Sequence, residues 1–227
     1  MILDFTLETP AGQRPLRVDI GELVIAGWAG RDRAAIEHHI EELAAIGVPR
    51  PSAVPLYYRV AANQLTQDAS VQVVGPASSG EAEVFVFMAD GELCVSLASD
   101  HTDRKLEAHS VALSKQLCVK PLARTAWRMA DVAGHWDELH LGSRIVENGA
   151  EVVYQDGTLA SLRTPQDLIA GYTGGGPLPA GTAMLCGTVA VKGGIRPAAV
   201  FEMSLADPRS GRRIVHRYTQ ALLPEVA

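Results

Sequence analysis

Cysteine, long apolar runs and clustered cations are all scarce in this sequence of 227 residues. Its 3 cysteines, Cys94, Cys118 and Cys186, are too few and too scattered for a disulfide framework or a CxxC metal site. We expect them to be buried thiols in a reducing compartment. No stretch approaches the roughly 18 apolar residues of a membrane span, and the segment Met1 to Phe5 has no basic or apolar signal region. These absences predict a cytoplasmic protein with no membrane partner.

Positive charge is also in deficit, with 20 Lys and Arg against 26 Asp and Glu and a formal net charge of −6. A nucleic-acid binder needs clustered cations that displace counterions from phosphates. The longest basic run here is Arg212-Arg213, so the composition excludes nucleic acid as a partner. Apolar residues make up 47% of the chain, which is typical of a globular protein and excludes disordered and fibrous classes.

Glycine and proline are spread along the whole chain, which favours many short elements joined by turns. Asn148-Gly149 is a strong hairpin signal between two of the expected strands. We predict strands over 15–26, 55–60, 69–74, 82–88, 92–98, 143–147, 151–155, 182–191, 198–205 and 213–222. We predict helices over 32–46, 104–117 and from 164 to about 171. This order predicts an α+β fold that is mainly β, a roll or sandwich with a few short helices, rather than a parallel doubly wound sheet.

The helix predicted over 32–46 carries a His and a Glu one turn apart. His39 leans toward the apolar side of the helix, and Glu42 at i+3 lies on the same flank, so the two side chains can meet. A carboxylate that fixes the tautomer and raises the basicity of a His is what a general base requires. The alternative is an ordinary solvated helix edge.

Two glutamates stand at the start of an apolar strand. Glu81 and Glu83 are two residues apart, so on a strand they point to the same face. Like charges at the entrance to a core repel each other unless a cation lies between them, and oxygen ligands suit Mg²⁺ or Mn²⁺. The alternative is a polar strand end at the surface.

A third carboxylate follows the next apolar strand. Asp100 comes at its end, and Arg104 is a nearby countercharge. His101 is compatible with zinc, but no HxH or HExxH spacing supports that metal. The residues therefore favour an oxygen-ligated divalent site.

These segments, in this order, resemble the fumarylacetoacetate hydrolase-like family from about residue 23 to 205. The matching segments are His39-Ile40-Glu41-Glu42-Leu43, Glu81-Ala82-Glu83, Asp100-His101-Thr102-Asp103-Arg104, Asn148-Gly149 with Tyr154-Gln155-Asp156, and Leu178-Pro179-Ala180-Gly181 with Cys186-Gly187-Thr188. The resemblance implies one fumarylacetoacetate hydrolase-like domain over 1–227, with 1–22 as an N-terminal strand extension. It also implies a catalytic His-Glu pair, a metal held by Glu81, Glu83 and Asp100, and a homodimer.

The sequence departs from the family pattern in ways that indicate a compact, divergent branch. The interval from Glu83 to Asp100 is short, and Val189 replaces the proline of the closing Gly-Thr-Pro motif. The active-site lysine of the family has two candidates, Lys115 and Lys120. Lys115 is preferred because Pro121-Leu122 then falls where the family has Pro-Leu.

Three further residues are candidates for holding the substrate. Tyr58 and Arg59 lie on the segment that matches the family's substrate-facing strand, where alternation puts Tyr57 and Arg59 on one face and Tyr58 on the other. The alternative is that Tyr57 and Tyr58 are ordinary strand aromatics. A guanidinium there binds a carboxylate in bidentate fashion. In the family pattern, Thr188 approaches the acid end of the substrate. Trp127, Trp136, His135 and His140 are interpreted as surface or packing residues.

Together these residues predict a Mg²⁺- or Mn²⁺-dependent hydrolase that cleaves a C–C bond of a small β-dicarbonyl or acylpyruvate-like oxo acid. The expected mechanism combines a metal-stabilised enolate with water activated by His39 and Glu42, and Lys115 stabilises the developing oxyanion. The same scaffold is associated with oxo-acid decarboxylation, isomerisation and dehydration of 2-keto-3-deoxy sugar acids, and the metal ligands alone do not separate these. A non-catalytic metabolite-binding protein is the alternative of another class.

Overall fold

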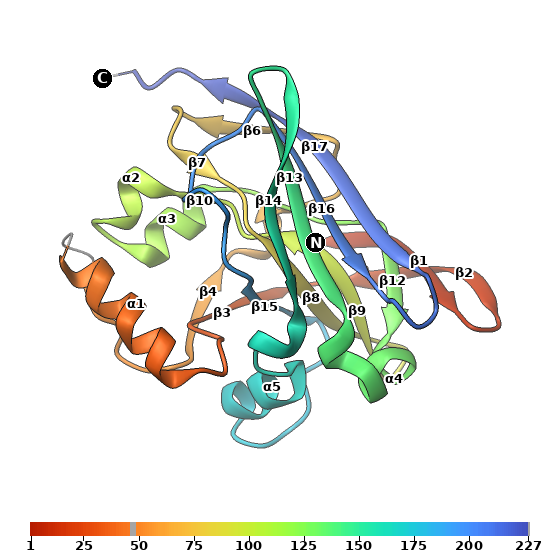
Figure 1. Ribbon diagram of the computed structural model, residues 1–227. Helices are drawn as coiled ribbons and strands as arrows, with labels where there is room; N and C mark the ends of the chain where they lie inside the picture. Colours follow the sequence, from red (N-terminus) through yellow and green to blue (C-terminus); the bar gives the residue numbers. More distant parts are fainter. Residues whose placement is uncertain (46–48, 227) are drawn as a thin grey trace.

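Two β-sheets form most of the molecule, and short helices lie at their ends (Figure 1). The structure is a computed structural model that describes residues 1–45 and 49–226, and the side chains of His39, Glu42 and Leu43 lie outside the described part. The strands of the eight-stranded sheet are, in sheet order, β2 (Gly12–Asp19), β1 (Ile2–Thr9), β12 (Thr125–Arg128), β9 (Glu92–Ser99), β8 (Ala82–Ala89), β15 (Thr182–Thr188), β3 (Glu22–Gly27) and β4 (Leu56–Val60). Those of the five-stranded sheet are β14 (Ala150–Thr158), β13 (His140–Glu147), β16 (Val200–Ala206), β17 (Arg213–Leu223) and β6 (Ser70–Val74).

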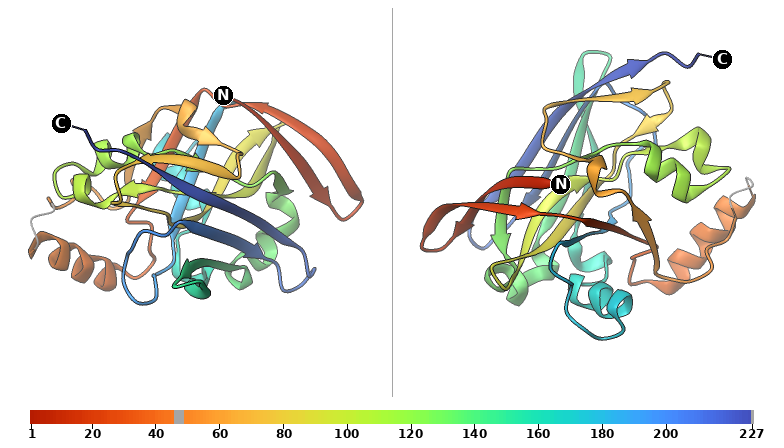
Figure 2. Two further views of the ribbon diagram at one scale, coloured as in Figure 1. Left: turned by 90° about the horizontal axis from the view of Figure 1, so that it is seen from above. Right: turned by 180° about the vertical axis from the view of Figure 1, so that it is seen from behind.

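Short ladders and helices complete the chain. The two-stranded ladders are β10 (Thr102–Asp103) with β7 (Ser78–Ser79), and β11 (Lys120–Pro121) with β5 (Leu65–Thr66). The helices are α1 (Arg33–Ala45), α2 (Arg104–Glu107), α3 (Val111–Leu117), α4 (Met129–Val132) and α5 (Pro165–Thr173), with 3₁₀ turns over 62–64, 133–138 and 159–161. Helices α1, α2 and α3 lie on one side of the sheets and α4 and α5 at one end, as the two further views also show (Figure 2). The mainly β, α+β fold class is confirmed.

The eight-stranded sheet is buried on both faces. Along β8, Val84 and Val86 join the core between the two sheets, whereas Phe85 and Phe87 join a second core beneath the β1–β2 hairpin. Because both of its faces are buried, β8 has consecutive apolar residues rather than an alternation of apolar and polar residues. A charged side chain at the end of such a strand is surrounded by protein, and it needs a partner.

Several predicted boundaries are confirmed by local geometry. Asp32 accepts hydrogen bonds from the backbone N–H groups of Ala34 and Ala35 at 2.9 and 3.1 Å and so caps α1. The β13–β14 turn has positive φ at Asn148 (51°) and Gly149 (79°), as a two-residue hairpin turn requires. The three cysteines are buried and free.

Other predictions are wrong in detail. The single helix expected over 104–117 is two helices, because Ser110 accepts a hydrogen bond from the N–H of Leu113 and begins α3. The strand expected over 182–191 ends at Thr188. Strand β12 was not predicted, although it places Trp127 fully inside the core. No described helix is long and apolar enough to cross a membrane.

Candidate metal and substrate site

Three carboxylates meet where β8 begins and β9 ends. The strands are antiparallel, with Ala82 opposite Ser99, so the residues that flank this pair lie side by side. The N–H of Asp100 donates to the carbonyl of Glu81 at 2.9 Å, which fixes the two segments together. Carboxylate oxygens of Glu81, Glu83 and Asp100 all lie within 4.8 Å of one another. The structure therefore brings together the three residues that the sequence predicts as ligands.

Asp100 is a fully buried anion held by two lysines. Lys115 Nζ on α3 donates to Asp100 Oδ2 at 2.5 Å, and Lys120 Nζ lies 3.1 Å from Oδ1. Burial alone raises the pKa of Asp100, but the two ammonium groups outweigh it and lower that pKa to about 2. Asp100 is thus ionised throughout the neutral range.

The two lysines differ in what surrounds them. Lys120 is fully buried and also donates to the backbone carbonyls of His101 and Lys115, the latter at 2.7 Å, so its donors are used inside the protein. Lys115 has Asp100 as its ion-pair partner among the described residues, and its ammonium lies 5.8 Å from the centre of the Tyr58 ring. Lys115 is the lysine of the two with donors left for a substrate.

Glu83 is a buried carboxylate with no cation paired to it among the described residues. Only 4% of the residue is exposed, and its Oε2 accepts a hydrogen bond from the N–H of Gly187 at 2.9 Å. Burial is the main cause that raises its pKa well above the ordinary value, and the negative charge of Asp100 adds to it. Such a group ionises when a cation is supplied.

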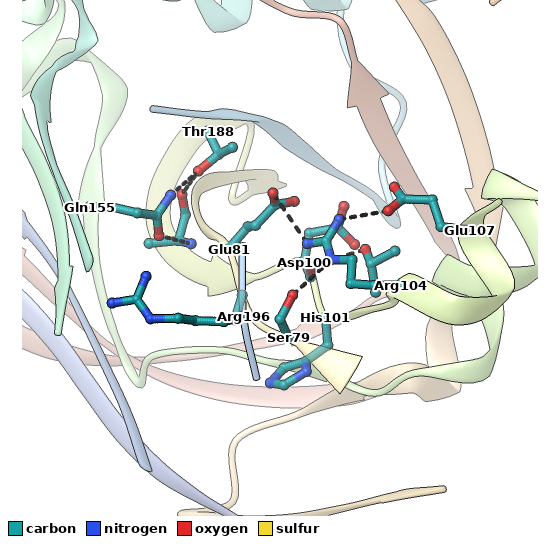
Figure 3. A network of polar contacts seen from close by, with 12 residues as sticks. Ser79, Glu81, Asp100, His101, Arg104, Glu107, Gln155, Thr188 and Arg196 are labelled. Carbon is teal, nitrogen blue, oxygen red and sulfur yellow. Dashed lines mark hydrogen bonds and ion pairs between the residues drawn. The ribbon is translucent and has the colours of Figure 1, made fainter. Parts of the chain in front are cut away.

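Glu81 belongs to a charged network that extends to α2 (Figure 3). Arg104 lies 3.2 Å from Glu81 and 3.0 Å from Glu107, and its Nε donates to Ser79 Oγ at 2.7 Å. Burial acts to lower the pKa of Arg104, but the two glutamates prevail and raise it above the ordinary value. Arg104 is the countercharge that the sequence predicts beside the carboxylates.

Gln155 forms hydrogen bonds to three segments beside the carboxylates (Figure 3). Its Oε1 accepts from the N–H of Ala82 at 2.9 Å and from Ser143 Oγ at 2.7 Å. Its Nε2 donates to Thr188 Oγ1 at 2.5 Å and to the carbonyl of Val189 at 2.9 Å. Thr188 in turn donates to the carbonyl of Ala82 at 2.7 Å. Thr188 therefore lies beside Ala82, the residue between Glu81 and Glu83. Its hydroxyl is hydrogen-bonded to protein groups.

The donor set fits a hard divalent cation. It consists of carboxylate oxygens only, and two of the three residues are buried. Asp100 Oδ1 accepts no well-formed hydrogen bond although it is buried. Hard divalent ions such as Mg²⁺ bind through carboxylate oxygens and complete their shell with waters and substrate oxygens. The charges and free lone pairs of this site suit such an ion.

The histidine next to Asp100 belongs to a different network. His101 is buried, with Nδ1 2.9 Å from Ser78 Oγ and Nε2 2.7 Å from the hydroxyl of Tyr218. Burial lowers the pKa of His101 to about 3, so the ring is neutral. With both nitrogens engaged, it is no ligand of the carboxylate site, which agrees with the sequence argument against zinc.

Strand β4 presents its two candidate residues to opposite sides, as alternation predicts. Tyr58 faces Lys115, and burial raises the pKa of its phenol. Arg59 instead lies 3.0 Å from Glu22 and donates to the hydroxyl of Tyr172 at 3.3 Å. The structure thus brings Tyr58 to the site and pairs Arg59 elsewhere.

The proposed water-activating pair is not placed by the structure. The backbone of α1 includes positions 39 and 42, but the side chains of His39 and Glu42 lie outside the described residues. Their roles stay predictions. Gly187 and Gln155 stand in segments that match the family pattern, but the sequence did not predict their hydrogen bonds to Glu83 and Ala82, because these contacts join strands that are far apart in the chain.

Comparisons with known proteins give a family and a fold. A family model described as "Protein of unknown function (DUF2848)" matches residues 26–218. No curated protein has a significant sequence match to the chain. Among solved structures, the crystal structure of Cg1458 with inhibitor is 14% identical to this chain, with a TM-score of 0.66. The match covers 94% of this chain and 81% of the Cg1458 chain.

A second solved structure is 2-keto-3-deoxy-D-arabinonate dehydratase complexed with magnesium and 2,5-dioxopentanoate. It is 15% identical to this chain, and the TM-score is 0.65. The match covers 96% of this chain and 79% of the dehydratase chain. At these identities the likeness concerns the fold, which is of the fumarylacetoacetate hydrolase-like type.

Proposed function

This chain belongs to the DUF2848 family, and we propose that it is a divalent-metal-dependent enzyme that acts on a small 2-oxo acid. One observation carries the proposal: three carboxylates lie within 4.8 Å of one another, and the buried Glu83 among them has no cationic partner in the described part of the chain. Clustered buried carboxylates are costly to a fold unless a cation uses them. This argument favours an enzyme over a binding protein that has lost its ion.

Mg²⁺ or Mn²⁺ is the cofactor we propose, held by Glu81, Glu83 and Asp100. When bound, such an ion would supply positive charge that attracts a 2-oxo acid and favours negative charge on its carbonyl oxygen. The similar fold of a 2-keto-3-deoxy-D-arabinonate dehydratase complexed with magnesium and 2,5-dioxopentanoate supports this choice.

The reaction we favour is hydrolysis of a C–C bond in an acylpyruvate-like compound. Water oxygen bonds to the distal carbonyl carbon, the adjacent C–C bond breaks, and its electron pair stays with the pyruvate half, which takes up a proton. His39, oriented by Glu42, takes the proton from water, an effect of about 10²- to 10⁴-fold. Lys115 donates to the oxygen that becomes negative, since its ammonium keeps donors beyond the one given to Asp100.

The carboxylate of the substrate is assigned to Tyr58, Arg59 and Thr188. Tyr58 is the one of these that already faces Lys115. Arg59 has to leave Glu22, and Thr188 has to redirect a hydroxyl that donates to Ala82. A larger loss of activity from Tyr58→Phe than from Arg59→Lys is therefore expected.

Dehydration of a 2-keto-3-deoxy sugar acid is the second candidate, because fold neighbours include a dehydratase of this kind. The two reactions differ in the fate of water. We propose assays in H₂¹⁸O with Mg²⁺ and Mn²⁺ after treatment with a chelator. Hydrolysis puts ¹⁸O into the released acid, whereas dehydration releases water and leaves the carbon chain intact. Binding without turnover of any acylpyruvate or 2-keto-3-deoxy acid would contradict the enzyme proposal and favour a metabolite-binding protein.

His39→Ala tests the water-activating role within this proposal. The variant should lose about 10²- to 10⁴-fold in kcat while it binds metal and substrate as the wild type does, since a general base acts on the reaction and not on binding. Steady-state kinetics and calorimetry give the two quantities, with His38→Ala as the matched control. An unchanged kcat would remove His39 from the mechanism.

A further inference from the structure

A hollow lies on the outer face of the five-stranded sheet. Along β13 and β16, Leu141 and Met203 point into the core between the two sheets, so the neighbouring Gly142 and Ser204 face away from it. Gly142 pairs with Ser204 on one side and with Asp156 of β14 on the other. Because glycine has no side chain, the sheet forms a hollow of about 280 Å³ at this position.

Charged side chains surround the hollow, and its carboxylates have cationic partners. Asp156 lies 2.6 Å from Lys192. Glu202 lies 3.2 Å from Arg217, which also contacts Glu151 at 2.6 Å. The acidic groups are therefore already engaged with cations of the protein. The lining residues that carry a charge or a titratable group are His140, Arg144, Asp156, Glu202 and Arg213.

Three polar side chains at the hollow have no partner in the described part of the chain. The guanidinium groups of Arg144 and Arg213 make no hydrogen bond or ion pair there. Only 8% of Ser204 is exposed, and its hydroxyl is likewise unpaired among the described residues, 3.7 Å from the place that a Cβ on Gly142 would take. Buried polar groups in native proteins are nearly always hydrogen-bonded. These groups indicate a place for a polar ligand.

The two arginines stand at opposite ends of the hollow. Arg144 pairs with Glu202 of β16, and Arg213 pairs with Ala206 on the other side of the same strand. Those two partners are four residues apart, which is about 13 Å along a strand, and Ser204 lies midway between them. Each guanidinium is therefore available to a different end of one ligand, and the hydroxyl faces its middle.

This arrangement suits a small molecule with an acid group at each end. A guanidinium presents its N–H donors in a planar fork that matches the two oxygens of a carboxylate. Two such groups without acidic partners favour a ligand that carries two negative charges. Sites for drug-sized ligands occupy roughly 300–1,000 Å³, so a hollow of about 280 Å³ takes a short ligand.

The hollow shares residues with the network that holds the carboxylate site. Ser143 and Gln155 also line it. The register between β13 and β14 shifts between Ser143 and Arg144, because Tyr154 is an extra residue on β14. As a result of this bulge, Tyr154 and Gln155 are both buried, and Gln155 accepts from the N–H of Ala82. A ligand in the hollow lies against the outer side of the bulge that orients Gln155.

We propose that the hollow binds a short dicarboxylate, with one carboxylate at Arg144, the other at Arg213, and Ser204 as a further donor. The bound diacid stabilises the β13–β14 bulge, and in this way it raises the affinity of the carboxylate site for its ion. The diacid is an effector and not the substrate. The binding site is independent of the proposed function, whereas the effect on the ion rests on it.

Calorimetry of the chelator-treated protein with succinate tests the binding site. The wild type should bind succinate, and Arg144→Gln and Arg213→Gln should each weaken binding by about 10- to 100-fold, the value of a hydrogen bond to a charged group. Arg14→Gln, which removes an exposed arginine paired with Asp90, is the matched control and should bind as the wild type does. No heat with succinate, or equal affinity in the wild type and Arg144→Gln, overturns the proposal. Equal affinities for acetate and succinate overturn the choice of a diacid.

Titration with Mg²⁺ in the presence and absence of saturating succinate tests the effect on the ion. The Kd for Mg²⁺ should fall by about 5-fold or more, the lower end of typical allosteric coupling, and the Kd for succinate should fall by the same factor when Mg²⁺ is bound. Arg213→Gln should bind Mg²⁺ as the wild type does without succinate, and the effect of succinate should vanish. An unchanged Mg²⁺ affinity in the wild type, or an effect that persists in Arg213→Gln, overturns the coupling.

The two titrations separate failure of the inference from failure of the proposed function. Mg²⁺ binding without succinate binding overturns the inference and leaves the proposed function standing. Succinate binding without any Mg²⁺ binding overturns the proposed function and the coupling, and it supports the dicarboxylate site.

Discussion

Replacement of Asp100 by Asn removes the anion that two buried lysines share. Lys115 and Lys120 lie 2.5 and 3.1 Å from the two oxygens of Asp100, and all three side chains are buried. The amide of Asn keeps the size of the side chain but carries no charge. Two ammonium groups are then left inside the protein without the partner that balances them.

The expected cost follows from that geometry. Removal of one member of a buried ion pair destabilises a protein by about 3–5 kcal/mol, because the remaining charge is desolvated without compensation. For a chain of this size 1 kcal/mol corresponds to about 2–4 °C in Tm, so Asp100→Asn should lower Tm by roughly 6–20 °C.

Glu83→Gln is the matched control at the same site. Glu83 accepts from the N–H of Gly187, which the amide oxygen of Gln also does, and no cation is paired with Glu83 in the described structure. Its pKa is raised by burial, so its contribution to stability is full below the ordinary value and is lost as pH rises through the folded value. The metal-free Glu83→Gln variant at pH 8 should therefore be at least as stable as the wild type.

Urea unfolding at pH 8 with a chelator measures both effects, followed by circular dichroism and fluorescence. Addition of Mg²⁺ at about 100 times its Kd should stabilise the wild type by about 2.7 kcal/mol and neither variant. Equal losses of stability in Asp100→Asn and Glu83→Gln would refute the reasoning, because one carboxylate is paired with lysines and the other is not. Wild-type stability in Asp100→Asn would refute the lysine pairing itself.

Two further predictions concern buried polar contacts. Gln155→Leu leaves the N–H of Ala82 without its partner and removes the acceptor of the Ser143 hydroxyl, so it should cost about 2–4 kcal/mol in urea unfolding, against less than 1 kcal/mol for the exposed control Gln13→Leu. Asp207 is the buried acceptor for His135 and Ser210; burial opposes ionisation, but its hydrogen bonds prevail and lower its pKa to about 2. Its stabilisation is present above the ordinary pKa and is lost as pH falls, so Asp207→Asn should lower stability at pH 7 by about 1–3 kcal/mol, and the difference from the wild type should vanish between about pH 4 and 2. A constant difference across that range would contradict the assignment.

The local part of the candidate site could be predicted from the sequence. Glu81 and Glu83 share a face because of strand periodicity, and Asp100 joins them because a short turn pairs β8 with β9. The cap formed by Asp32 and the hairpin turn at Asn148-Gly149 could be predicted for the same reason, since caps and tight turns depend on residues that are close in the sequence.

Contacts between distant strands could not be predicted in this way. The amide of Gly187 reaches Glu83 across 104 positions of the chain, and Gln155 reaches Ala82 across 73. Strand β12 was missed because a pattern of Thr, Ala, Trp and Arg is not recognisably apolar until the pairing with β1 and β9 buries it. The pairing of Arg59 with Glu22 likewise depends on tertiary placement.

Calorimetric titration of the chelator-treated protein with Mg²⁺ tests the central claim most directly, namely that Glu81, Glu83 and Asp100 hold a divalent ion. The account predicts one ion bound per chain in the wild type and no measurable binding in Glu83→Gln, which keeps the fold. Equal Mg²⁺ affinity in the wild type and in Glu83→Gln would contradict it.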